Sequence, residues 1–144
     1  MMYPVKKMYL SEKKKLEDEG YAVFSPEFFQ EALLNFLSRL GYLYQVTSRQ
    51  GNRKEIMQAY VAGFKGILGV GVALHAQEDI SQPNLTYSDK KISELYLDIY
   101  EKALDLKYTL KDYTFYALFS TYLVLGNSLG FNFEDITYVY ENEK

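Results

Sequence analysis

The sequence predicts an all-α protein, a helical bundle of about five to six helices. Apolar residues recur every three or four positions along the long segments, and no segment alternates with the period of two that is typical of strands. Residue types that begin helices recur between these segments. With 144 residues, of which 48% are hydrophobic, the chain is long enough to bury a core. We therefore expect one all-α domain over residues 1–144.

Two helices are expected in the first third of the chain. Ser11 can cap a first helix that stops near Gly20. Residues 25–27, with the sequence Ser-Pro-Glu, combine a capping hydroxyl, a proline suited to the first helical position and an early acid. Apolar residues with helical spacing follow over residues 28–43, so the second helix is predicted to bury one face.

A third helix is predicted from Ile56 to Ala76, after a break at Gly51. Asn52 can cap this helix, with Glu55 three residues later in a capping-box relation. Small residues fall every three or four positions along the segment, as expected where another backbone must come close. The segment is also apolar enough for a buried strand or a membrane span, but its length and spacing favour a helix. Its polar residues argue against a span.

The last third of the chain is predicted to hold three more helices. A loop over residues 77–88 precedes a helix that starts at Ser88 or Asp89. The later start and stop signals are a capping box, a glycine suited to a helix end and a second capping box. These residues are Thr109 with Asp112, then Gly130, then Asn132 with Asp135.

Composition argues against several classes of function. The chain has no cysteine, so disulfides, thiol nucleophiles and thiolate zinc sites are excluded. A net charge of −3 gives no general attraction to nucleic acid, and acids surround the lysine run at residues 13–15. Residues 1–16 contain lysines with no apolar run after them, which argues against a signal peptide. We expect a cytoplasmic protein that binds neither nucleic acid nor membranes.

Residues 113–140 carry a resemblance to a known family. They contain an aromatic-Leu-Phe helix, the break Leu-Gly-x-x-Leu-Gly-Phe at residues 125–131, and an acid-Ile-x-x-x-Tyr helix. This pattern resembles the C-terminal region of the dimeric, all-α dUTPase family, part of the all-α NTP pyrophosphohydrolases. Residues 38–45 and 67–74 are similar to segments of the family's two earlier helices. The resemblance implies a dUTPase-like domain over residues 1–144 that forms a homodimer.

The resemblance also implies where a metal site would lie. Members of the family hold Mg²⁺ between a Glu-x-x-Glu pair on one helix and a Glu-x-x-Asp pair on the next, and the ions bridge triphosphate oxygens and activate water. Aligned on the resemblance, the first pair falls on Arg39 and Tyr42 and the second on Ala59 and Ala62. None of these side chains binds Mg²⁺ as a carboxylate does. We therefore expect a degenerate pocket between two packed helices, without metal or catalytic residues, in which Arg39 and Tyr42 fill the vacated space.

Three interpretations follow for function. The leading one is a divergent dUTPase-like protein without pyrophosphohydrolase activity, which retains a binding, structural or regulatory role toward a nucleotide or a protein partner. The second is an active, Mg²⁺-dependent dUTP or NTP pyrophosphohydrolase, with Glu31 and Glu55 as displaced carboxylate ligands. The third is an unrelated helical protein-interaction module. Whether carboxylates converge in space separates the second interpretation from the other two.

Overall fold

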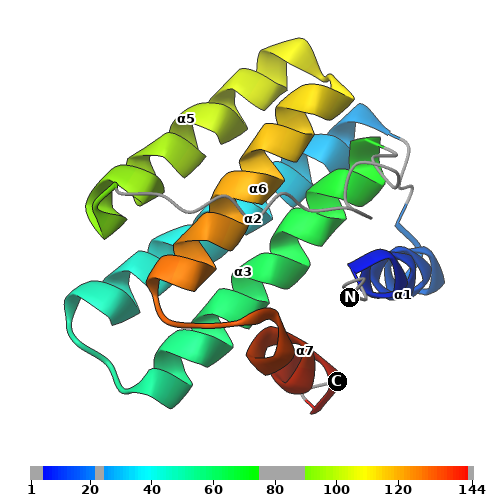
Figure 1. Cartoon of the computed structure of the whole chain (residues 1–144). Coiled ribbons are helices and arrows are strands. Elements are labelled where there is room, and N and C mark those ends of the chain that lie inside the picture. Colours follow the sequence, from blue (N-terminus) through cyan, green and yellow to red (C-terminus); the bar gives the residue numbers. More distant parts are fainter. Residues whose placement is uncertain (1–4, 22–24, 75–89, 143–144) are drawn as a thin grey trace.

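A computed structural model describes residues 5–21, 25–74 and 90–142 of the chain (Figure 1). The described residues form helices joined by turns, with no strand among them, so the predicted all-α fold of five to six helices is confirmed. The helices are α1 (Val5–Asp18), α2 (Pro26–Ser48), α3 (Arg53–Leu74), α5 (Ile92–Thr109), α6 (Asp112–Ser128) and α7 (Phe133–Asn142).

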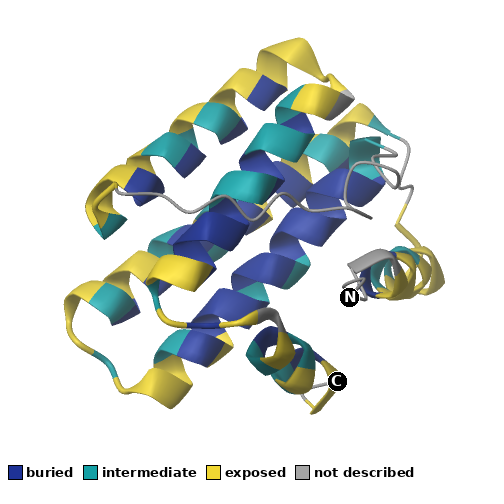
Figure 2. Ribbon diagram, viewed as in Figure 1, coloured by how far each residue is buried: buried dark blue, intermediate teal, exposed yellow. Residues whose placement is uncertain are grey.

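Helix α3 is the central element of the bundle. It forms an antiparallel hairpin with α2, and α1, α6 and α7 also pack on it, whereas α5 pairs with α6 and contacts α2 (Figure 1). Thirteen of the 22 residues of α3 are buried (Figure 2). By length and composition α3 could cross a membrane, but 67% of its apolar window is buried by the rest of the protein. This burial is typical of a core helix.

Several predicted helix ends are present in the structure. The Ser25 hydroxyl accepts a hydrogen bond from the Phe28 N–H at 3.1 Å, and the Asn52 side chain accepts one from the Glu55 N–H at 2.8 Å. Asn132 and Asp135 exchange side-chain to backbone bonds of 2.8 and 3.2 Å, which completes a capping box at the start of α7. The chain leaves α6 through a glycine with a φ of +91°, a conformation that favours glycine, and this residue is Gly130 as predicted.

Other predicted ends were wrong. Ser11 lies inside α1, which extends to Val5 and so brings the buried Met8 and Tyr9 onto the core. Helix α3 begins at Arg53, one turn before the predicted Ile56, because the Asn52 cap directly precedes it.

The helix boundaries around α5 also differ from the prediction. Helix α5 begins after Lys91, whereas the predicted starts at residues 88 and 89 and the loop over 77–88 lie outside the described residues. Thr109 is the last residue of α5 and caps nothing, because Leu110 makes the turn in a left-handed conformation with a φ of 51°. Lys111 then occupies the N-cap position of α6 without a side-chain capping bond.

Two tyrosines join α3 to α6 at the centre of the core. The Tyr60 hydroxyl donates to the Tyr122 carbonyl at 2.9 Å, and the Tyr122 hydroxyl donates to the Tyr60 carbonyl at 2.6 Å. Their rings are stacked, with centroids 4.6 Å apart and planes 7° apart. Both side chains are fully buried, and each hydroxyl donates its hydrogen bond to the carbonyl of the other tyrosine.

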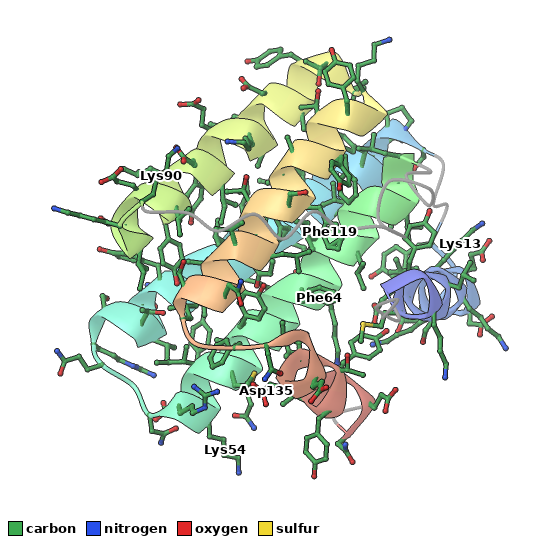
Figure 3. The ribbon with its side chains drawn as sticks, viewed as in Figure 1. Lys13, Lys54, Phe64, Lys90, Phe119 and Asp135 are labelled. Carbon is green, nitrogen blue, oxygen red and sulfur yellow. The ribbon has the colours of Figure 1, made fainter. Side chains whose placement is uncertain are left out.

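Glycines make room for this tyrosine pair. A Cβ at Gly63 would lie 2.2 Å from the Tyr122 hydroxyl, and a Cβ at Gly126 would lie 2.4 Å from the Tyr60 ring. Beyond the pair, Phe64 of α3 and Phe119 of α6 continue the contact, with ring centroids 5.9 Å apart (Figure 3). The two helices therefore pack by placing each tyrosine over a glycine of the other.

Two identical substitutions in α3 should change stability in opposite directions. Gly63→Ala should lower the free energy of unfolding by about 1–3 kcal/mol, because the new methyl overlaps Tyr122 in a packed core. Gly69→Ala should raise it by up to about 1 kcal/mol, because a Cβ at Gly69 meets nothing within 4 Å and alanine favours the helix. Urea unfolding followed by circular dichroism measures both. A loss of stability in both variants would contradict this packing.

Stability should also fall at alkaline pH. Burial raises the pKa of Tyr96 to about 12, although its hydrogen bond with Thr47 opposes the shift, and burial also raises the pKa of Tyr60 and of Tyr122. A tyrosine in the unfolded chain loses its proton near pH 10, so above pH 10 the unfolded state binds fewer protons than the folded state. The buried tyrosines therefore contribute their full stabilisation below pH 10, and the free energy of unfolding decreases from pH 10 toward pH 12. Urea midpoints at pH 8 and pH 11 measure the fall, which Tyr96→Phe should reduce and Tyr108→Phe, at a 79% exposed position, should not.

Candidate functional site

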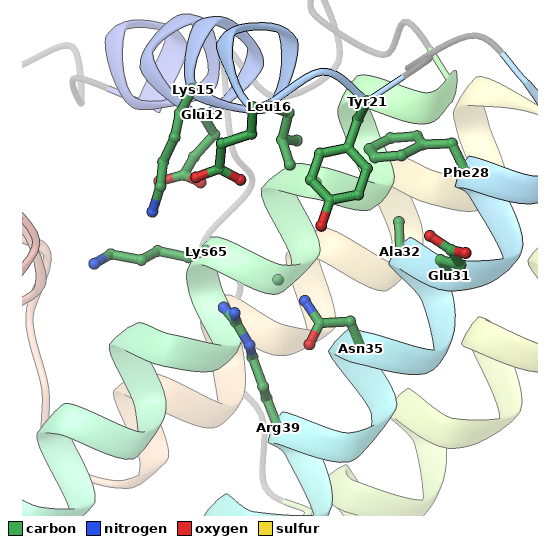
Figure 4. Close-up of a pocket in the computed structure, with 13 residues that line it drawn as sticks. Glu12, Lys15, Leu16, Tyr21, Phe28, Glu31, Ala32, Asn35, Arg39 and Lys65 are labelled. Carbon is green, nitrogen blue, oxygen red and sulfur yellow. The ribbon is translucent and has the colours of Figure 1, made fainter.

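A pocket that is lined mostly by polar and charged side chains lies between α1, α2 and α3, with a volume of about 410 Å³ (Figure 4). Three acids and three bases line it, so the lining carries no net charge at neutral pH. The acids are Glu12, Glu19 and Glu31, and the bases are Lys15, Arg39 and Lys65.

Arg39 extends from α2 across the face of α3. Its Nη1 donates to the Ala62 carbonyl at 2.7 Å. A Cβ at Gly66 would lie 3.4 Å from the Arg39 Cδ and 3.2 Å from the Phe36 Cα. This glycine therefore allows α2 to come close to α3 and the Arg39 side chain to lie against α3. The guanidinium also opposes the rise in the pKa of Tyr122 that burial and Tyr60 cause. Arg39 therefore brings a positive charge close to the core between α2, α3 and α6.

The four predicted pocket positions occupy matching levels of α2 and α3. Arg39 contacts Ala62, and in an antiparallel pair the residues one turn away, Tyr42 and Ala59, then come to the same level. Ala59 is buried, but the Tyr42 side chain is 53% exposed. The structure thus brings Arg39 and Ala62 together beside a buried alanine and leaves the tyrosine largely on the surface.

The two carboxylates considered as displaced ligands lie far apart. Glu31 is near the start of α2 and lines the pocket. Glu55 is in the first turn of α3, where it forms an exposed ion pair of 3.3 Å with Arg49, just beyond the end of α2. Positions 31 and 49 are 18 residues apart in sequence, which corresponds to about 27 Å of helix. One metal ion cannot contact both carboxylates in this arrangement.

The described residues do not fit the Mg²⁺ that the family resemblance implies. Among residues 5–21, 25–74 and 90–142, no group of three or more His, Asp or Glu side chains is placed to hold a metal ion. Mg²⁺ keeps several waters and needs carboxylate oxygens at about 2.1 Å in near-octahedral geometry. In place of such a site, this region of α2 and α3 contains Arg39 hydrogen-bonded to a backbone carbonyl.

Sequence reasoning missed the contribution of α1 to the pocket. The Tyr140 hydroxyl lies 3.2 Å from the Met8 carbonyl and 3.0 Å from a Glu12 carboxylate oxygen, so α7 holds α1 in place. Burial, followed by the charge of Glu12, raises the pKa of Tyr140. The Lys65 Nζ lies over the Tyr140 ring, 5.4 Å from the ring centroid. One signal for this site was present in the sequence, because Lys65 is the only charged residue between Ile56 and Leu74.

A second, apolar surface lies along α2 and α5. Tyr44 and Tyr96 pack edge to face at 5.2 Å, and together with Tyr100 they line a depression of about 230 Å³. The Tyr96 hydroxyl lies 3.0 Å from the Thr47 hydroxyl, which satisfies its polar end. Three leucines on these helices are more than half exposed. They are Leu34, Leu97 and Leu104, with exposed fractions of 66%, 70% and 52%.

Comparison with known proteins identifies the family of this chain. The family model described as dUTPase matches residues 38–144, which is more than half of the chain. The matched region begins within α2 and includes α3, α5, α6 and α7, whereas α1 lies outside it. No curated protein and no solved structure gives a significant match. The match confirms the resemblance predicted from the C-terminal motifs, and the chain belongs to the all-α dUTPase family.

Proposed function

We propose that this protein is a dUTPase-like protein that has lost pyrophosphohydrolase activity and retains a binding role in the pocket between α1, α2 and α3. The observation that carries the proposal is the contact between the Arg39 guanidinium and the Ala62 carbonyl. By our alignment, both residues stand at positions where the family holds carboxylates. A fixed cation at these positions takes the place of the bound metal ion and repels Mg²⁺.

Electrostatics supports the loss of hydrolysis. A metal-dependent pyrophosphohydrolase needs cations that neutralise charge on the triphosphate and a metal-bound water that attacks it. The pocket lining has equal numbers of acids and bases, so it does not offset the charge of a triphosphate by itself. The separation of Glu31 from Glu55 weakens the alternative of an active enzyme with displaced ligands.

The first test of this proposal is pyrophosphate release from dUTP and the other nucleoside triphosphates, with Mg²⁺ or Mn²⁺. We expect no release above that of a buffer control, because no described group of carboxylates can hold the ions. Turnover that is lost in Glu31→Gln or Glu55→Gln, but not in the matched surface variant Glu101→Gln, would establish the active enzyme instead. Turnover that none of these changes affects would mean that the alignment of α2 and α3 with the family is wrong.

We further propose that the protein is a cytoplasmic homodimer, with the apolar surface of α2 and α5 as its interface. Members of the dUTPase family usually form oligomers. Leu97 is 70% exposed and lies beside Tyr44 and Tyr100, and Leu34 of α2 and Leu104 of α5 are also more than half exposed. Exposed apolar side chains that gather on neighbouring helices mark a candidate protein–protein interface. An interface between two copies of this surface would bury these side chains with two-fold symmetry.

Light scattering coupled to size-exclusion chromatography tests the interface. The unmodified protein should elute with the mass of a dimer at high micromolar concentration. Leu97→Lys should give a monomer, because the interface would then bury two unpaired ammonium groups. Tyr138→Lys, at an equally exposed position on α7, should remain dimeric. A monomeric unmodified protein, or equal behaviour of the two variants, would contradict the proposed interface.

A further inference from the structure

The pocket between α1, α2 and α3 arranges its polar groups in a definite order along α2. Glu31, Asn35 and Arg39 are spaced four residues apart, so they lie on one face of the helix and span about 12 Å along its axis. Lys65 of α3 lies at the Arg39 end (Figure 4). Along α2 the pocket therefore presents an acid, an amide and a base in that order, and Glu12 of α1 lies on the same side of the pocket as Lys65 (Figure 4).

The acidic end of the pocket also has an aromatic wall. The rings of Tyr21 and Phe28 lie 5.8 Å apart at an angle of 54°, and the Tyr21 hydroxyl points into the pocket (Figure 4). The floor is formed by α3, where a Cβ added at Gly69 would meet nothing within 4 Å. This end thus combines apolar ring surface with a carboxylate and has open space beside it.

We propose that this pocket binds a short peptide of two or three residues with free, charged ends. The peptide's carboxylate pairs with Arg39 and Lys65, and its ammonium group pairs with Glu31. The Asn35 side chain can both donate to and accept from a peptide group in the middle. An extended chain spans about 3.5 Å per residue, so three residues reach about 10 Å, close to the spacing of the two charged ends of the pocket.

The first side chain of the peptide lies against Tyr21 and Phe28, where an apolar group gains burial and the neighbouring ammonium group faces an aromatic ring. A zwitterion matches a lining with three charges of each sign, whereas a polyphosphate would face three carboxylates without a metal. This inference rests on the proposed function, because a metal at the Arg39 position would displace the guanidinium that receives the peptide's carboxylate.

The test is isothermal titration calorimetry with the tripeptide Phe-Ala-Ala, its N-acetylated form and its C-terminal amide. We expect saturable binding of the free tripeptide and roughly tenfold weaker binding of each blocked form, because each lacks one charge-assisted hydrogen bond. In Glu31→Gln, the free and the N-acetylated peptides should bind equally, with the affinity of the blocked form. Glu27→Gln, an exposed change one turn earlier on α2, should bind the peptides as the unmodified protein does.

Three outcomes would overturn the peptide proposal. One is the absence of heat with the free tripeptide, and the second is equal binding of the free and blocked forms to the unmodified protein. The third is tighter binding of dUMP or inorganic phosphate than of the tripeptide, with the loss of that binding in Arg39→Gln. The proposed function fails on a different measurement, which is metal-dependent pyrophosphate release, so the two failures are distinguishable.

Discussion

The reciprocal contact of Tyr60 and Tyr122 holds α3 and α6 together, and so joins the α2–α3 pair to the α5–α6 pair. Each hydroxyl is buried and donates to a carbonyl of the other helix, so a shift of either helix breaks buried hydrogen bonds. The contact requires Gly63 and Gly126, because a methyl group at either position would overlap a tyrosine ring or hydroxyl. Small residues on α3 are therefore a packing requirement, although each glycine lowers intrinsic helix propensity.

The small residues of α3 also explain the arrangement of the candidate site. Gly66 lets α2 approach closely enough for Arg39 to lie across α3 and reach the Ala62 carbonyl. The space between these helices thus contains a hydrogen-bonded cation beside small side chains. Helix α1, which lies outside the matched family region, forms one wall of the pocket and is held in place by Tyr140 of α7. Helices inside and outside the matched region together produce a pocket whose lining carries both charge signs.

Much of the fold could be predicted from local patterns. The caps at Ser25, Asn52 and Asn132 are local signals, since each side chain bonds a backbone group three residues away, and all three are present. The predicted cap at Thr109 was wrong because the turn depends on Leu110 in a left-handed conformation. Leucine rarely adopts this conformation, so its presence could not be predicted from the residue type.

The site was less accessible to sequence reasoning. Arg39 was identified as a pocket residue because the family pattern marked its position. The roles of Lys65, Tyr21 and Glu12 depend on how α1 packs against α2 and α3, and no spacing within one helix encodes that contact. The partner of Arg39 is a backbone carbonyl, which every residue carries, so the sequence alone could not single out Ala62 as its acceptor.

An anomalous difference map from crystals soaked in Mn²⁺ reports the occupant of the space between α2 and α3. We expect no manganese peak between these helices and an Arg39 guanidinium within hydrogen-bonding distance of the Ala62 carbonyl. A peak between α2 and α3 that is ligated by two or more carboxylates, with Arg39 displaced toward solvent, would contradict this expectation.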